Sequence, residues 1–286
     1  EIIATLGSKE GLANLAMAIT APGDVMLVPN PSYPIHPYGF MIAGGTLRHL
    51  PTLHDGKFKP EEYMQSLSRA VAHSVPKPVA LVVSFPSNPT AQLCDIDFYE
   101  ELISFAKKNN LWVLSDLAYA EIYFDGNPPP SILQVNGAKE VAVEFTSLSK
   151  TFSMPGWRMG FAVGNSRLID ALTRIKSYLD YGAFTRIQVA AATALNGETD
   201  CIASIRDTYK SRRNTLIDSM ERIGWTIPSP PATMFAWAPL PIKFQQIGSM
   251  AFSKILLQEA SVAVSPGIGF GEYGDCLLYT SDAADE

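Results

Sequence analysis

The sequence predicts an α/β fold, in which a mostly parallel central sheet is covered by helices on both faces, followed by a smaller C-terminal α+β domain. Short β-branched or apolar segments alternate with segments of helical periodicity along the first part of the chain. Most of the short segments are apolar throughout, as is typical of strands buried on both faces. The alternation changes after about residue 195, so we expect a large domain over residues 1–195 and a small one over 196–275.

The chain opens on a β-branched run, from Ile2 to Thr5, that is typical of the inside of a strand. Further strands bounded by turn residues are predicted at residues 24–29, 45–51, 80–86, 111–116, 141–147 and 159–164. A helix is predicted before the strand at 111–116. Asp97 and Glu100 form a capping-box-like start, and apolar residues then recur at helical spacing until Asn109.

Beyond residue 195, apolar residues from Ile202 to Ile223 trace one face of a long helix, which Gly224 ends. An aromatic strand at 234–238 and a helix through Phe252 to Ala260 follow. Residues 276–286 resemble a translated transposon-type sequencing adaptor, so we exclude them from the fold prediction. We expect both ends to be cut, so that each domain is truncated.

Composition excludes several classes of protein. The chain has 286 residues, 47% hydrophobic and 17% charged, with a formal net charge of −6. A disordered chain would be less apolar, and a nucleic-acid-binding protein would be basic, so no nucleic-acid partner is expected. The longest apolar stretch, Gly11 to Val28, is interrupted by polar residues and proline, so no membrane span is expected.

The three cysteines are too scattered for a disulfide framework or a metal site, which favours a reducing, cytoplasmic setting. The four histidines show no metal-ligand spacing, and we expect them to be surface or loop residues. They are His36, His49, His54 and His73. The sequence therefore predicts no metal site.

The segment from Ser147 to Gly160 carries the strongest chemical signal, because it places a lysine between two predicted buried strands. Taken alone, Lys150 would be interpreted as a surface lysine on a connecting loop. Burying an ammonium group is costly unless it is neutralised, paired or bonded covalently. A lysine that bonds to a carbonyl compound removes that cost, and the neighbouring residues favour this second interpretation.

Ser147-Leu-Ser149-Lys150, followed eight residues later by Arg158 within Gly-Trp-Arg-Met-Gly, resembles the pyridoxal-phosphate lysine segment of fold-type I, class I/II aminotransferases. Three further motifs occur in the family's order: Gly7-Ser-Lys-Glu-Gly11, Ser87-Asn-Pro-Thr90 and Asp116-Leu-Ala-Tyr119. The resemblance extends to about Asp275. It is greatest to bacterial alanine (glutamate–pyruvate) transaminases, with LL-diaminopimelate aminotransferases next, and it implies pyridoxal 5′-phosphate (PLP) as the cofactor.

The resemblance implies a role toward the cofactor ring for four residues. Asp116 would keep the ring nitrogen protonated, although an Asp after a strand is as often a helix N-cap. Tyr119 and the Asn88 amide would hydrogen-bond the phenolic oxygen, but alone Asn88 would be interpreted as a turn residue. Tyr33 would stack on the ring, the alternative being a packed loop tyrosine.

The phosphate group would be held at the start of the first helix. Ser8 and Lys9 precede a helical run, whose exposed amides can bind an anion, and Lys9 would contribute its amide rather than its charge. The alternative for a Gly-Ser pair at this place is simple helix capping. Ser147, Ser149 and Arg158 would complete the site, since a guanidinium binds phosphate through paired donors.

The resemblance implies that Lys150 bonds to PLP and then moves a proton as general acid and base. The expected reaction is ping-pong transamination between an amino acid, alanine or glutamate, and a 2-oxo acid, pyruvate or 2-oxoglutarate. Three alternatives stay open: an LL-diaminopimelate or other amino-acid aminotransferase, a PLP β-lyase, and a non-enzymatic aminotransferase-like sensor domain of a transcription regulator. The family also implies a homodimer. The fragment itself is expected to be inactive, because the family's substrate-carboxylate arginine lies beyond Asp275.

Overall fold

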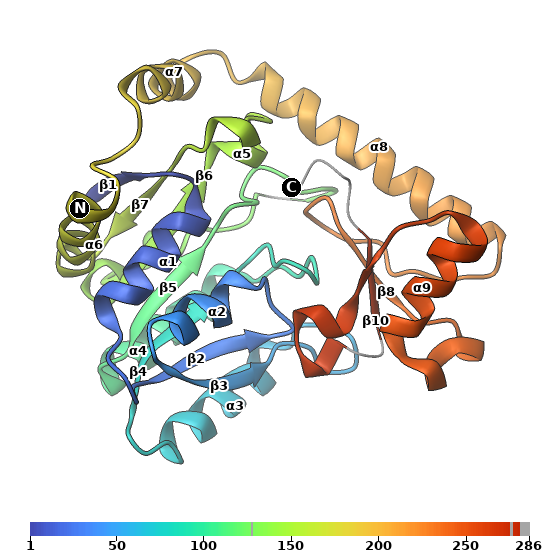
Figure 1. The fold of residues 1–286 in the computed structure, drawn as a ribbon, viewed down its shortest axis with the longest axis horizontal. Coiled ribbons are helices and arrows are strands. Elements are labelled where there is room, and N and C mark those ends of the chain that lie inside the picture. The colour runs from blue at the N-terminus through green and yellow to red at the C-terminus, as the bar shows by residue number, and fades with distance from the viewer. Residues whose placement is uncertain (127, 275–276, 281–286) are drawn as a thin grey trace.

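The computed structural model describes residues 1–126, 128–274 and 277–280. A large lobe built on a seven-stranded sheet lies beside a smaller lobe built on a three-stranded sheet (Figure 1). The strands are β1 (Ile2–Thr5), β2 (Val25–Asn30), β3 (Thr46–Pro51), β4 (Pro78–Val83), β5 (Trp112–Asp116), β6 (Ala142–Ser147), β7 (Gly160–Gly164), β8 (Ala236–Pro239), β9 (Ser265–Pro266) and β10 (Leu277–Thr280). The helices are α1 (Ser8–Ile19), α2 (Ile35–Ile42), α3 (Pro60–Ala72), α4 (Ile96–Asn109), α5 (Leu148–Thr151), α6 (Ser166–Leu179), α7 (Thr185–Asn196), α8 (Asp200–Arg222) and α9 (Gly248–Ala260).

The large sheet confirms the α/β prediction. Its strand order is β1-β7-β6-β5-β4-β2-β3, and strands β2 to β6 are parallel to one another. Among the strands of this sheet only β7 runs in the opposite direction: it is antiparallel to both of its neighbours, β6 and β1, so β1 runs in the same direction as β6. Each of the seven strands predicted within residues 1–164 is present, shifted by at most a few residues at its ends.

Helices cover both faces of this sheet because its strands are apolar on both sides. Along β2, Met26 and Val28 pack in one apolar cluster with α1, α2 and α6, whereas Leu27 packs in a second cluster with α3 and α4. Neighbouring residues of a strand point to opposite faces, so one short strand supplies both clusters. The same alternation places Leu81 and Val82 of β4 in different clusters.

The start of α4 differs from the prediction. The N-cap is Asp95, whose Oδ1 accepts a hydrogen bond from the Phe98 amide at 2.9 Å, so the capping-box start at Asp97 is wrong. Asp95 lies three residues before Phe98, the spacing at which a capping carboxylate meets an amide of the first turn. The end of the helix is as predicted, since Asn110 takes the left-handed conformation (φ 52°) that terminates it.

The small lobe contains the expected long helix. Helix α8 ends in a Schellman arrangement, in which the Trp225 amide donates to the Met220 carbonyl and Gly224, at φ 78°, donates to the Glu221 carbonyl. The aromatic strand begins at Ala236, two residues later than predicted, because Thr233 at φ 69° turns the chain just before it. The three-stranded sheet has the order β8-β10-β9.

Strand β10 lies within the segment that we interpret as adaptor-derived. It pairs antiparallel with β8 and with β9. Cys276 and residues 281–286 of that segment lie outside the described residues. The origin of the segment and the domain boundary at 195/196 stay predictions.

No helix in the described part of the chain is long and apolar enough to cross a membrane. Within the same ranges, no group of three or more His, Cys, Asp or Glu side chains is arranged to hold a metal ion.

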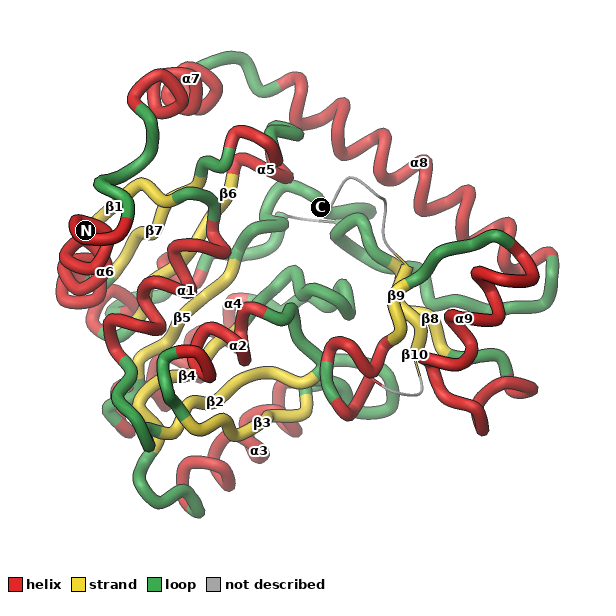
Figure 2. The backbone as a smooth tube through the Cα atoms, viewed as in Figure 1, coloured by secondary structure: helices red, strands yellow, loops and turns green. Residues whose placement is uncertain are grey.

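The topology brings several chain segments to one edge of the large sheet. The carboxyl ends of β2, β4, β5 and β6 meet at this edge because these strands are parallel. Antiparallel β7 begins there, with Gly160 opposite both Thr5 and Ser147, so β1 also ends there. The loops that follow these strands lie between the sheet and the small lobe (Figure 2).

Candidate active site

Asp116, the last residue of β5, is a buried carboxylic acid at this edge. It is 7% exposed, and its Oδ2 lies 2.9 Å from Nε2 of His36, which is 0% exposed. The other oxygen, Oδ1, is buried and has no hydrogen-bond partner among the described residues. The pair therefore places a carboxylate with one free acceptor at the floor of the site.

His36 is the functional residue that the sequence analysis missed. The expectation that it is a surface or loop residue is wrong, because it lies on α2 and is fully buried. Its face of the helix carries Gly39 and Phe40, at the i+3 and i+4 positions, and both are buried. That apolar face could have indicated that His36 is buried. It could not have indicated the partner, because Asp116 lies 80 residues away in sequence. His49 and His73 are exposed, as expected.

The start of α1, which follows the end of β1 at this edge, is a second part of the site. Its N-cap is Gly7, at φ 87°, and the structure shows no side-chain capping bond to this helix end. A Cβ on Gly7 would lie 2.4 Å from Nη2 of Arg158, so the absence of a side chain allows the guanidinium to approach the backbone. The first amides of α1, including those of Ser8 and Lys9, thus face a region next to a cation, which is the arrangement that binds anions.

Ser147, Ser149 and Arg158 are held together by the turn between β6 and β7. The Ser147 hydroxyl accepts a hydrogen bond from the Ser149 amide at 3.2 Å and caps α5. Arg158, in the left-handed conformation, donates to the Ser149 hydroxyl at 3.5 Å and to the carbonyls of Pro155 and Leu6 at 2.9 and 3.1 Å. The structure therefore brings these three residues to the start of α1.

Lys150 lies on α5, directly after the carboxyl end of β6, and is half-buried. Burial and the nearby charge of Arg158 lower the pKa of its amine to about 8. Its Nζ lies 3.9 Å from the Met234 sulfur and 5.8 Å from the centre of the Tyr119 ring. A lysine in this state has an appreciable neutral fraction at neutral pH, which is what a nucleophilic amine requires.

The remaining expected residues lie at the same edge. Tyr119 is buried, with its ring against Phe235 at a centroid distance of 5.2 Å. Tyr33 lies edge-on to His36 at 6.0 Å, and Nζ of Lys9 lies 5.5 Å from the Tyr33 ring. Asn88, in the loop after β4, is buried, and its Oδ1 has no partner among the described residues.

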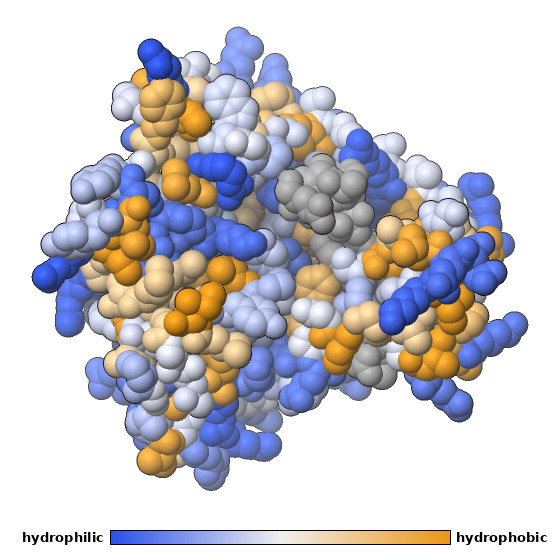
Figure 3. Space-filling model, in the orientation of Figure 1, coloured by the Kyte–Doolittle hydropathy of each residue, from blue (hydrophilic) through white to orange (hydrophobic). Residues whose placement is uncertain are grey.

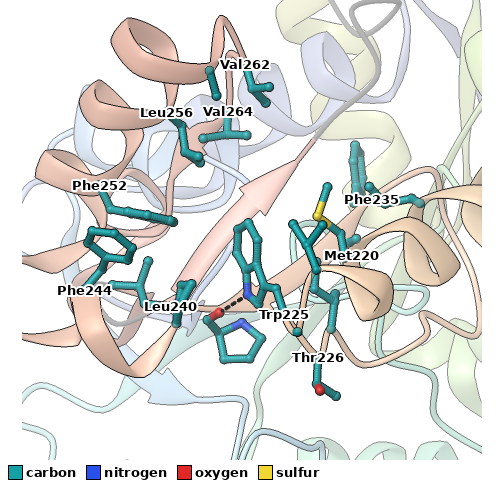
Figure 4. Close-up of a pocket in the computed structure, with 18 of the residues that line it drawn as sticks. Met220, Trp225, Thr226, Phe235, Leu240, Phe244, Phe252, Leu256, Val262 and Val264 are labelled. Atoms are coloured by element: carbon teal, nitrogen blue, oxygen red, sulfur yellow. Dashed lines mark hydrogen bonds between the residues drawn. The ribbon is translucent and has the colours of Figure 1, made fainter.

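A large apolar cavity lies elsewhere, in the small lobe. It has a volume of about 1230 Å³ and lies between α8, β8 and α9 (Figure 4). Trp225, Phe252 and Leu256 line it, and the Trp225 indole donates to the Pro239 carbonyl at 2.8 Å. None of the ten expected site residues lines this cavity, so the edge of the large sheet is the candidate active site.

Comparison with known proteins identifies the family. Residues 1–277 match the model of the family described as aminotransferase class I and II, and the chain belongs to this family.

Three curated relatives align with this chain over 275 residues, 96% of its length. The identity is 62% to AatC of Rhizobium meliloti (strain 1021), named as an aminotransferase, over 67% of that protein. It is 50% to the glutamate-pyruvate aminotransferase AlaC of Escherichia coli (strain K12), over 66%, and 43% to an LL-diaminopimelate aminotransferase of Natranaerobius thermophilus, over 69%. The chain thus spans about two thirds of these relatives.

The fold also matches solved structures. An aminotransferase from Staphylococcus aureus superposes with a TM-score of 0.90 at 30% identity, over 98% of this chain and 72% of that one. Fold and family agree, and the cofactor of the class I/II family is PLP.

The side chains present fit that cofactor. The unpartnered Oδ1 of Asp116 can accept a hydrogen bond from a protonated ring nitrogen, and the unpartnered Oδ1 of Asn88 is a second buried polar atom without a protein partner among the described residues. The uncapped start of α1 beside Arg158 suits a phosphate, and Lys150 supplies an amine of lowered pKa. A single PLP molecule would therefore use all three features: the Asp116 carboxylate, the anion site at the start of α1 and the Lys150 amine.

Proposed function

We propose that the protein carrying this chain catalyses PLP-dependent transamination between an amino acid and a 2-oxo acid, with Lys150 as the residue that bonds to the cofactor. The observation that carries the proposal is the lysine itself. Its pKa is lowered to about 8, and it lies at the same sheet edge as the Asp116–His36 pair and the anion site of α1. When bound, PLP supplies an electron-withdrawing ring that stabilises negative charge at the Cα of an amino acid.

Lys150 has two tasks in this proposal. Its amine would be the group that bonds to the cofactor, and burial together with the Arg158 charge maintains the neutral fraction that such a bond requires. With an amino acid bound in its place, the freed amine would act first as general base and then as general acid for the proton at the substrate Cα. An amine of pKa about 8 is suited to both steps near neutral pH.

Oδ1 of Asp116 would accept a hydrogen bond from the protonated ring nitrogen, and His36 fixes the orientation of Asp116 by occupying Oδ2 and leaving Oδ1 available. Tyr119 and Asn88 are proposed to bind the phenolic oxygen, and Tyr33 to pack on the ring. Ser8, Lys9, Ser147, Ser149 and Arg158 are proposed to hold the phosphate. In each case the residue acts by binding or orienting and not by bonding covalently.

For the substrates, we propose alanine or glutamate with pyruvate or 2-oxoglutarate, supported by the 50% identity to AlaC. An LL-diaminopimelate substrate is the second candidate, favoured by the 43% identity to an enzyme of that name. A PLP β-lyase would share the site residues, because the cofactor directs the chemistry. A sensor domain would bind PLP without turnover.

A substrate panel with the purified whole protein that carries this chain, and not with the 286-residue chain alone, separates these proposals. Transamination consumes an amino acid only when a 2-oxo acid is present and yields the paired products, whereas a β-lyase releases ammonia without a 2-oxo acid. Lys150→Ala is expected to abolish turnover and the absorbance band of lysine-bound cofactor. The exposed Lys108→Ala serves as the matched control and should retain both. Turnover by Lys150→Ala, or none by the parent protein on any pair, would refute the proposal.

We further propose that the protein is a cytoplasmic homodimer. Apolar side chains are exposed on α2, where Met41 is 52% and Ile42 is 76% exposed, and an orange apolar patch lies over this region (Figure 3). The turn after α6 exposes Tyr181 and Phe184 as well. Light scattering on the purified protein tests the dimer, and Ile42→Asp is expected to shift it toward monomer.

A further inference from the structure

Lys176 is a buried lysine outside the set of residues assigned to the cofactor. It lies in the last turn of α6 and is only 3% exposed. Its Nζ donates to Oε1 of Glu10 at 2.8 Å and to Oδ2 of Asp180 at 2.6 Å. A buried ammonium group is tolerated only when carboxylates compensate its lost hydration, so these three side chains form one unit.

Glu10 connects this unit to the start of α1. It lies in the first turn of that helix, and its Oε2 accepts a hydrogen bond from the Leu6 amide at 2.7 Å. The Leu6 carbonyl accepts a hydrogen bond from Nη2 of Arg158 at 3.1 Å. Leu6 is thus bound on one side by Glu10 and on the other by Arg158. The backbone before Gly7, where the proposed phosphate site begins, is fixed by both contacts.

The charge of Glu10 conflicts with the proposed phosphate site. A carboxylate in the first turn stabilises a helix, but it also repels a phosphate dianion bound at the same helix end. Glu10 is only 21% exposed, so water screens its charge weakly. Among the described residues, Lys176 is the one cationic side chain that forms an ion pair with Glu10.

Asp180 holds Lys176 in place. Its Oδ2 accepts from Nζ, and its Oδ1 accepts from the Gly182 amide at 2.7 Å, which ties the turn after α6 to the same unit. Lys176 is therefore fixed between helix α1 and the end of helix α6, which lie far apart in sequence and pack side by side.

We propose that Lys176 is a positioning residue for the phosphate end of the cofactor. It neutralises Glu10 and holds that carboxylate on the Leu6 amide, so that the first amides of α1 accept a dianion. Lys176 acts through Glu10 and does not itself bond the phosphate. The proposal rests on the PLP site proposed above.

The experiment compares two ligands on the apo form of the protein. PLP and pyridoxal share the ring and the aldehyde, but only PLP carries the phosphate. Lys176→Met removes the charge while keeping an unbranched side chain, and leaves Glu10 uncompensated. We expect it to weaken PLP binding about tenfold or more, the effect of one poorly screened like charge near the ligand, and to leave pyridoxal binding within about twofold.

Two further variants separate charge from shape. Lys176→Arg restores the cation and should recover PLP affinity to within about threefold of the parent. The double variant Glu10→Gln/Lys176→Met removes both charges, keeps an acceptor for the Leu6 amide, and should also recover it. If Lys176→Met does not fold, these two variants still test the proposal, because both keep the net charge of the Glu10, Lys176 and Asp180 unit the same as in the parent.

Equal losses of PLP and pyridoxal affinity in Lys176→Met would overturn the proposal, since they would show a structural role without specificity for phosphate. So would a double variant as weak toward PLP as Lys176→Met. Failure of the proposed function gives a different result, namely that the parent protein forms no lysine-bound PLP at Lys150.

Discussion

Replacing His36 with Leu isolates the contact that orients Asp116. His36 is fully buried, and its Nε2 is the hydrogen-bond partner recorded for the Asp116 carboxylate among the described residues. Leu has a similar bulk and no donor, so the variant leaves both oxygens of a 7% exposed carboxylate without a partner from the described side chains.

The magnitude follows from that geometry. A hydrogen bond to a charged group contributes about 1.5–3 kcal/mol. If the Asp116 orientation is used to bind the protonated ring nitrogen, the loss corresponds to about a 10- to 150-fold weaker PLP affinity. His36→Gln keeps a nitrogen donor on a shorter side chain and is expected to lose less.

The assay is titration of the apo protein with PLP, followed by the absorbance of lysine-bound cofactor, with urea unfolding in parallel. His73→Leu, at an exposed histidine, is the matched control and should bind PLP as the parent does. An unchanged PLP affinity in a folded His36→Leu variant would refute the role of this contact. A loss of stability with no change in affinity per folded molecule would show that His36 acts only in packing.

Three other predictions follow from the site and its support. Burial and the charge of Arg158 lower the pKa of Lys150 to about 8, and only the neutral amine reacts with an aldehyde. The rate at which pyridoxal forms its imine with Lys150 should therefore rise about tenfold from pH 7 to pH 9. A rate that does not change with pH would contradict this. Gly7→Ala should weaken PLP binding, because its Cβ would lie 2.4 Å from Nη2 of Arg158. The control Gly23→Ala, also at positive φ but with open space around it, should cost only about 1–2 kcal/mol of stability and leave PLP binding unchanged. If Gly7→Ala binds PLP as tightly as Gly23→Ala does, the predicted clash is wrong. Glu144→Leu should lower the free energy of unfolding by about 2–4 kcal/mol, more than Glu144→Gln, because the buried carboxylate accepts hydrogen bonds from Ser115, Ser131 and the Ile132 amide; urea denaturation measures the difference.

Much of the fold was predictable because the signals are local. Apolar strands alternating with helical periodicity predicted the strands of the large sheet and their mostly parallel arrangement, and the differences were the N-cap of α4 and the ends of some strands. The capping error at α4 arose because Asp95 and Asp97 are both good caps, and the choice depends on which carboxylate meets an amide of the first turn. The motif residues Asn88, Asp116 and Lys150 lie at or just after the carboxyl ends of parallel strands. Such ends meet at one edge of the sheet, so these residues come together there.

The sequence by itself determined the family and the candidate site residues, because each motif is a short run whose residue types and order can be compared directly. Only the tertiary structure decided which side chains support them. His36 meets Asp116 across 80 residues, and Lys176 meets Glu10 across 166. The lowered pKa of Lys150 likewise depends on the burial that surrounds it. These contacts arise from packing between distant segments, and no local pattern in the chain encodes which segments pack together.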